Sequence, residues 1–155
     1  MEQSQKERIF DLDVRHFIYS TFAENCRPPT TDETADHFKT SIAEVENAYE
    51  NLANAHHIAL APGSYSIWMA HPFSGLPTNY VAKVGNKRFW GNLVWDVFGI
   101  AAILGKDAKG NAPCGCGKCN RKIELVIRHR HPVTSDWIVH FVVPAKRFWE
   151  NIGYT

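Results

Sequence analysis

The chain lacks a long apolar segment. None of its apolar runs reaches the roughly 18 to 20 residues that a membrane-spanning helix needs. Its first ten residues, MEQSQKERIF, are polar and lack the apolar core of a secretory signal peptide. From these two absences we expect a cytoplasmic protein with no membrane partner.

Cysteine is scarce, with 4 residues in a chain of 155, and neither repeats nor long low-complexity tracts are present. Because reducing pools keep cytoplasmic thiols free, we expect thiols or metal ligands rather than disulfides. Hydrophobic residues make up 45% of the chain and aromatic residues 12%. That composition is sufficient for a filled core in one domain or two small ones.

The net charge of +1 conceals an uneven distribution. Residues 1–80 contain 5 Lys and Arg against 11 Asp and Glu, whereas residues 81–130 contain 10 against 3. An acidic first part and a basic second part indicate two regions with different surfaces. We therefore predict two domains, residues 1–70 and residues 71–155.

The first region has the pattern of a winged helix. Helices are predicted over residues 13–25, 30–38 and 41–54, followed by a short β-hairpin over residues 58–69. Helix, short helix, helix and hairpin is the order of that motif. The third helix would enter the DNA groove, yet it carries Glu44, Glu46 and Glu50 and no Lys or Arg. Since phosphate contacts need cations, this argues against DNA binding and favours a packing or lid module.

The second region is predicted to be a small antiparallel or mixed sheet with one buried helix, which makes the fold class α+β. Gly85-Asn86 separates two strand-like runs, at residues 80–84 and 87–90, as in a hairpin. Residues 92–104 are apolar almost all round and are expected to form the buried helix, ended by Gly105. The remaining predictions are a loop over residues 106–120, strands over 122–130 and 137–143, and a short helix over 145–152.

One stretch carries a family resemblance. Residues 72–108, PFSGLPTNYVAKVGNKRFWGNLVWDVFGIAAILGKDA, followed by a cysteine-bearing loop, two strands and FWENIGYT, resemble the organomercurial (alkylmercury) lyase family. The resemblance implies a winged-helix-like domain joined to a small catalytic domain that cleaves carbon–mercury bonds by protonolysis. In that family, two cysteine thiolates hold mercury, a soft metal that prefers sulfur, and an aspartate delivers the proton. The first cysteine and the aspartate lie one helical turn apart in a W-C-x-x-D motif.

The chain departs from that motif. Asp96 matches the aspartate, but Leu93 stands at the cysteine position and Asn92 at the tryptophan position. The family's second cysteine follows the segment matched by ENIGYT, and the sequence has none there. A leucine can neither hold a metal nor carry a proton, so the two-thiol mechanism is not expected at this site. Cys114, which resembles a loop cysteine of the family, is the thiol that could substitute.

Asp96 is the predicted catalytic residue. An unpaired buried carboxylate costs several kcal/mol or takes up a proton near neutral pH, a state suited to acid–base catalysis. Backbone hydrogen bonds, or a partner such as Arg88 or Lys83, would instead make it a structural residue. We expect a pocket for a small-molecule substrate beside it. The predicted lining is Leu93, Trp95, Phe73, Trp90 and His71.

Cys114, Cys116 and Cys119 lie within six positions and include a C-x2-C pair. The glycines between them let the backbone fold tightly enough for several sulfurs to reach one ion. A tetrahedral zinc site would need a fourth ligand, for which the candidates are His129, His131 and Cys26. Free thiols, a structural zinc site and a mercury or copper site all stay open.

Three functions follow from these residues. The first is an enzyme that keeps the family scaffold and Asp96 but performs lyase, isomerase or cyclase chemistry on a small organic molecule, with no cofactor for the chemistry. The second is an organomercurial lyase or mercury-binding relative with rearranged thiols. The third is a non-catalytic metal-binding or regulatory protein. Loss of both thiolates with retention of Asp96 favours the first; the sequence predicts no oligomeric state.

Overall fold

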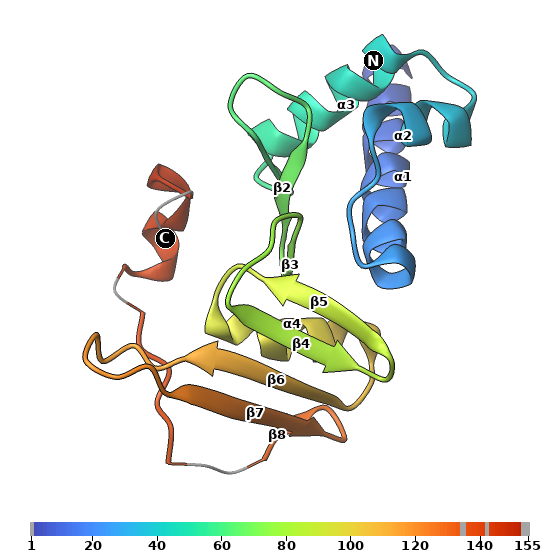
Figure 1. Ribbon diagram of the computed structural model, residues 1–155. Helices are drawn as coiled ribbons and strands as arrows, with labels where there is room; N and C mark the ends of the chain where they lie inside the picture. Colours follow the sequence, from blue (N-terminus) through green and yellow to red (C-terminus); the bar gives the residue numbers. More distant parts are fainter. Residues whose placement is uncertain (1, 134–135, 142, 153–155) are drawn as a thin grey trace.

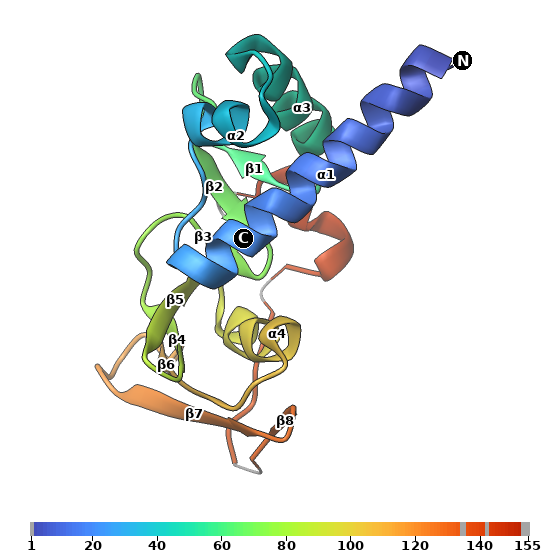
Figure 2. The ribbon, with the colours of Figure 1, turned by 90° about the vertical axis from the view of Figure 1, so that its right-hand side faces the viewer.

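A computed structural model describes residues 2–133, 136–141 and 143–152. Three helices come first, α1 (Glu2–Asn25), α2 (Thr31–Phe38) and α3 (Ile42–Asn54). Two antiparallel sheets follow, and one further helix, α4 (Val94–Leu104), covers a face of the second sheet (Figures 1 and 2). The α+β fold class is therefore confirmed. Within the described residues, no helix is both long and apolar enough to cross a membrane.

The starts of α2 and α3 are set by local sequence. Thr30 accepts a hydrogen bond from the Glu33 backbone N–H, and the Glu33 carboxylate accepts one from the Thr30 N–H. Ser41 and Glu44 repeat this capping box at α3. Such boxes satisfy N–H groups that the first helical turn leaves unpaired. By contrast, α1 starts at Glu2, well before the predicted start at residue 13.

The first sheet contains the predicted hairpin and one more strand. β1 (Ala59–Leu60) pairs with β2 (Ile67–Ala70), and β2 pairs with β3 (Phe73–Ser74). β3 lies beyond the predicted domain boundary at residue 70. The division into two domains and the winged-helix character of the first stay predictions.

The second sheet has the strand order β5-β4-β6-β7-β8. Its strands are β4 (Tyr80–Val84), β5 (Lys87–Gly91), β6 (Ala108–Pro113), β7 (Lys122–Arg128) and β8 (His131–Pro132). The hairpin around Gly85-Asn86 was predicted, but β6 was not, and the loop prediction for residues 106–120 is wrong over those six positions. β6 pairs on both sides, with β4 and β7. The hydrogen bonds of these two ladders stabilise it as a strand although its residues have low β-propensity. Gly110 is needed there because a Cβ would lie 2.2 Å from a Val97 methyl carbon.

Helix α4 buries one face only. Val97, Ile100 and Ala101 point into the core, whereas Trp95 and Ile103 are 43% and 50% exposed. The prediction of burial all round is therefore wrong for the outer face. The helix ends at Gly105, as predicted, with that residue in the left-handed conformation at φ 63°. It begins at Val94 because Leu93 is already the extended N-cap residue.

One continuous core joins the two parts of the chain. It runs from α1 and α3 through Phe73 to the second sheet and α4. The ring of Phe22, on α1, stacks on Phe73 with centroids 5.1 Å apart, and Phe73 also contacts Phe89 at 5.6 Å. This packing fixes the first helices against the element that leads into the second sheet.

The end of the chain departs most from prediction. Residues 137–141 form no strand, and Ile138 is 91% exposed; the rest of the predicted strand includes residue 142, which lies outside the described residues. The segment that pairs with the end of β7 is instead the short strand β8, opposite Ile127 and Arg128. β7 itself ends at Arg128 because His129 and Arg130 turn with positive φ. A 3-10 helix, η1 (Ala145–Glu150), takes the place of the predicted final helix.

Candidate functional site

Asp96 lies in the first turn of α4 and is 2% exposed. Its Oδ2 atom accepts hydrogen bonds from the backbone N–H groups of Asn92, at 2.8 Å, and Leu93, at 2.9 Å. A carboxylate at this end of a helix is also stabilised by the helix dipole. Oδ2 of Asp96 therefore caps the start of α4, and these hydrogen bonds fix the orientation of the carboxylate.

The other carboxylate oxygen faces a histidine. Oδ1 of Asp96 lies 4.0 Å from Nδ1 of His71, a pair separated by 25 positions in the chain. Nδ1 is buried and has no hydrogen-bond partner in the described structure, yet the His71 side chain is 31% exposed. The solvent-exposed part of the His71 ring is therefore the part away from Nδ1. Arg88 and Lys83, the predicted partners, are exposed and form no ion pair with Asp96 among the described residues.

The backbone around His71 is held from two sides. The Tyr19 hydroxyl, on α1, donates a hydrogen bond to the His71 carbonyl at 2.9 Å. Burial raises the pKa of Tyr19, so this hydroxyl keeps its proton. Gly99 of α4 lets Pro72 pack closely, because a Cβ there would lie 2.9 Å from a Pro72 carbon. The position of His71 relative to Asp96 therefore depends on α1 and α4 together.

The predicted lining residues lie in different environments. The Phe73 side chain is 1% exposed and belongs to the core, while its carbonyl accepts a hydrogen bond from the Asn92 amide at 3.3 Å. Leu93 and Trp90 are half-buried, and Trp95 is exposed with its ring edge-on to Phe141 at 5.9 Å. The substrate pocket itself stays a prediction.

Sequence reasoning missed Trp149. This residue of η1 packs edge-on against His71, with centroids 6.1 Å apart, and stacks on His56 at 4.3 Å with an interplanar angle of 5°. Phe148 beside it contacts Phe141. The aromatic pair Phe148-Trp149 is visible in the sequence, but no local pattern indicates that it returns to residue 71. The C-terminal aromatic residues thus form one side of the Asp96 region.

The three predicted metal ligands come together in the loop between β6 and β7. The sulfur atoms of Cys114, Cys116 and Cys119 all lie within 4.8 Å of one another, and the last two are 3.4 Å apart. The Lys118 backbone N–H, donating to the Cys116 sulfur, lowers the pKa of Cys116 to about 7, with help from the neighbouring thiols. The Cys116 backbone N–H likewise lowers the pKa of Cys114. The contacts of Cys114 with the other two sulfur atoms have a larger combined effect, so the pKa of Cys114 is raised.

The predicted fourth ligands are not part of this group. Among the described residues, no other His, Cys, Asp or Glu joins the three sulfur atoms within that distance. His129 and His131 follow the far end of β7, and Cys26 follows α1. The three thiols fit a soft metal ion, while a four-ligand zinc site is not complete in the described part of the chain.

The cysteine loop and Asp96 leave the sheet at the same end. The pairings Tyr80↔Gly91, Val81↔Asn111 and Pro113↔Lys122 place the end of β5, the end of β6 and the start of β7 together. Figure 1 shows the arrowheads of β5 and β6 on the same side. Neighbouring strands are about 4.8 Å apart, so the ends of β5 and β6, with β4 between them, are about 10 Å apart.

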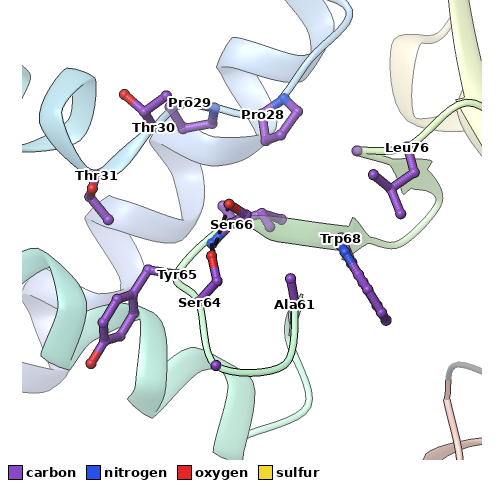
Figure 3. A pocket seen from close by; sticks show the side chains of 13 residues that line it. Pro28, Pro29, Thr30, Thr31, Ala61, Ser64, Tyr65, Ser66, Trp68 and Leu76 are labelled. Carbon is purple, nitrogen blue, oxygen red and sulfur yellow. Dashed lines mark hydrogen bonds between the residues drawn. The ribbon is translucent and has the colours of Figure 1, made fainter.

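A separate cavity of about 680 Å³ lies between the first helices and the first sheet (Figure 3). Its walls are residues 28–31, the turn between β1 and β2 with part of β2, and Gly75-Leu76. Among the described residues that line it there is no Asp, Glu, His or Cys, and the hydroxyl of Tyr65 donates to Glu50 at 2.6 Å. This cavity could therefore accommodate a molecule, but the carboxylate, imidazole and thiol groups that would act as acid, base or soft metal ligand are not among its described lining residues.

Residues 73–155 match the family model of MerB, the alkylmercury lyases. Among solved structures, the mercury-bound form of MerB2 is similar, with a TM-score of 0.61 and 13% sequence identity. That match covers 80% of this chain and 60% of the other, so this chain spans about three fifths of the length of MerB2. A comparison with curated proteins gives no match.

Proposed function

Because the chain belongs to the alkylmercury lyase family, we propose that it is an organomercurial-lyase-like enzyme that transfers a proton to or from carbon in a small organic molecule. The observation that supports this is the state of Asp96. Its carboxylate is buried, one oxygen is fixed by two backbone N–H groups, and the other faces His71. A structural cap needs only the first oxygen, which leaves the second for chemistry.

His71 gives the buried acid a connection to water. The distance of 4.0 Å between Nδ1 and Oδ1 is longer than a hydrogen bond, but catalytic contacts often tighten only when substrate binds. The Asp96 carboxylate removes a proton from the substrate carbon, and the electron pair of the broken C–H bond stays on that carbon. The proton passes to His71 and from its exposed ring to water, and a proton from water returns to the carbon by the same route. A buried nitrogen without a partner costs about 1–3 kcal/mol, which a relay role explains.

The surroundings favour an apolar or aromatic substrate. Leu93, at the position of the family's thiol, is a half-buried apolar residue whose backbone N–H donates to the acid. Trp95, in the same turn of α4, contacts Phe141, and Trp149 contacts His71, so both add aromatic surface near the pair. Binding sites for small molecules are mostly apolar with a few convergent polar groups, and Asp96 with His71 supplies these.

A second candidate is carbon–mercury cleavage with rearranged thiols. It is favoured by the cysteine loop, which leaves the same end of the sheet as the Asp96 turn. In this reaction the loop thiolates would hold mercury while Asp96 protonates the carbon. The carbon–mercury bond breaks, the hydrocarbon leaves, and mercury stays on sulfur.

Two assays separate these functions. In the first, a panel of small aromatic carbon acids is incubated with the protein in D2O, and deuterium uptake is measured by mass spectrometry. We expect uptake by at least one compound with the wild type and uptake at least about a hundredfold slower with Asp96→Asn; equal uptake with both proteins would contradict the proposal. In the second, phenylmercury is the substrate, and benzene release that requires both Asp96 and the loop cysteines would establish the alternative.

Leu93→Cys refines the second assay. The substitution places a thiol one turn before Asp96, where the family motif has one. If the missing thiol alone prevents cleavage, benzene release should appear with Leu93→Cys and disappear again in the double variant with Asp96→Asn. Absence of release from the single variant would show that this one thiol is not enough.

A further inference from the structure

The loop that joins β6 to β7 is built around its three sulfur atoms. We propose that Cys114, Cys116 and Cys119 form an exchangeable site that binds one thiophilic metal ion, such as mercury(II), through three thiolates without a fourth protein ligand. The site does not involve Asp96, so it stands or falls independently of the proton-transfer function.

The spacing of the sulfurs fits a single ion. Metal–sulfur bonds of about 2.3 Å place sulfurs about 3.8 Å apart in a tetrahedral site and about 4.0 Å apart in a trigonal plane. In the protein all three sulfurs lie within 4.8 Å of one another, and Cys116 and Cys119 are 3.4 Å apart. Binding therefore requires movements of less than about 1 Å on average.

The backbone supports this arrangement. The Cys114 N–H donates to the Arg121 carbonyl at 2.9 Å, which closes the base of the loop where the β6–β7 ladder ends. Gly117 adopts a φ of 69°, a conformation that favours glycine, and thereby lets Lys118 N–H point at the Cys116 sulfur. Backbone N–H groups directed at sulfur stabilise a thiolate.

The charge of the loop suits thiolates. Residues 114–122 contain Lys118, Arg121 and Lys122 and no Asp or Glu. Three thiolates around a divalent ion leave one net negative charge, which these cations offset. Each thiol gives up its proton to water as the ion binds.

The missing fourth ligand makes the site open. Structural zinc sites are usually closed by four protein ligands, whereas only three donors gather here in the described chain. Cys116 and Cys119 are exposed, so an incoming small thiol can reach the ion. A soft ion that accepts three sulfur ligands therefore matches this loop better than a locked zinc.

The test uses the full chain and mercury(II) alone. Reduced protein is incubated with one equivalent of mercury(II), free metal is removed by gel filtration, and bound metal is counted by native mass spectrometry. We expect one ion per chain, and a fall in reactive cysteines from the four free thiols to Cys26 only. X-ray absorption should show three sulfur neighbours for the wild-type complex. Two sulfur neighbours would overturn the proposal.

Variants locate the site. Cys114→Ser, Cys116→Ser and Cys119→Ser should each lose the three-sulfur signature, while Cys26→Ser, the matched control, keeps it. Thermal unfolding of each variant checks that the fold persists, and the wild-type absorption measurement decides the coordination if one does not fold. Loss of the signature in Cys26→Ser would overturn the proposal. One zinc per purified chain that resists a strong chelator would overturn the exchangeable character of the site.

Discussion

The first turn of α4 and the β6–β7 loop lie at one end of the same sheet, yet their physical environments are opposite. Asp96 is buried, fixed by two backbone N–H groups and surrounded by close packing. Cys116 and Cys119 are exposed and lie among cations. The family motif that this chain resembles combines thiol and acid in one helical turn. Here Leu93 stands at the thiol position, and our two proposals assign proton transfer and metal binding to separate regions.

These opposite environments predict which of the two regions can change without disturbing the fold. The acid is part of the helix cap and lies against Gly91, so its neighbours have little room. The loop holds its sulfurs with local backbone geometry and a hydrogen bond at its base. Substitutions in the loop should therefore alter metal binding alone, whereas substitutions that add volume around Asp96 should alter stability and chemistry together.

The strongest loss that we predict is in the rate of proton transfer. Asp96→Asn should lower the rate of Asp96-dependent deuterium uptake about 10²- to 10⁴-fold, the usual contribution of a general acid or base. An Asn side-chain oxygen can still accept the hydrogen bonds from Asn92 and Leu93, so the urea midpoint should change little. Asp13→Asn, an exposed change on α1, is the control.

The same assay with a variant carrying serine in place of all three loop cysteines completes this comparison. Its deuterium uptake should equal that of the wild type, because the loop thiols have no part in the proposed proton transfer. A large loss of deuterium uptake in this variant would indicate that the two regions act as one site and would favour carbon–mercury cleavage.

A second comparison uses two glycines. In Gly91→Ala the new Cβ would lie 2.8 Å from the Asp96 Cβ, so the first turn of α4 must shift. We expect a loss of about 1–3 kcal/mol in unfolding free energy, as for other overpacked positions. Gly115→Ala, in the loop, meets no atom within 4 Å and should stay within about 0.5 kcal/mol of wild type. Urea unfolding checks both; equal losses would contradict the proposed difference in packing.

The loop should also differ in its response to pH. The lowered pKa of Cys116, about 7, arises first from the Lys118 N–H and then from the neighbouring thiols. Because the thiolate is the nucleophile, alkylation of metal-free protein should increase with pH and be half-maximal near pH 7 at Cys116. Cys114, with a raised pKa, should react only at higher pH. Peptide mass spectrometry after iodoacetamide pulses measures each rate, and a single shared midpoint near 9 would contradict this assignment.

Local signals predicted the parts of the fold that depend on neighbours in sequence. The helix starts at Thr30 and Ser41, the stop at Gly105 and the hairpin at Gly85-Asn86 follow from caps and turns. β6 could not be predicted in this way, because Gly110 favours a loop until β4, β7 and Val97 close around it. The strand predicted over residues 137–143 is wrong at residues 137–141 for the complementary reason: an apolar sequence favours a strand, but the residues that pair with the end of β7 are those of β8.

In the candidate site, too, the residues marked by local sequence were predictable and the contacts between distant segments were not. Asp96 and the three cysteines could be selected by residue type and spacing, and the structure gathers the sulfurs as expected. The approach of His71 to Asp96 depends on Tyr19 and on the fit of Pro72 against Gly99, contacts between distant segments. The spacing of apolar residues along the sequence does not predict such contacts. His71 was a lining candidate because of its place in the chain, and Trp149 had no signal of that kind.

The smallest expected effect concerns Trp149, which connects η1 to the Asp96 region. Its stack on His56 and its edge contact with His71 should each contribute about 0.5–1.5 kcal/mol. Trp149→Ala should therefore speed amide hydrogen exchange across residues 145–150 by about tenfold, since about 1.4 kcal/mol corresponds to that factor. Trp137→Ala, a change beside Arg121 at the cysteine loop, is the matched control and should leave this exchange unaltered. Mercury binding by the loop should persist in Trp149→Ala, because Trp149 acts on the side of His71. Exchange that is unchanged in Trp149→Ala would mean that these aromatic contacts do not hold η1 beside the buried acid.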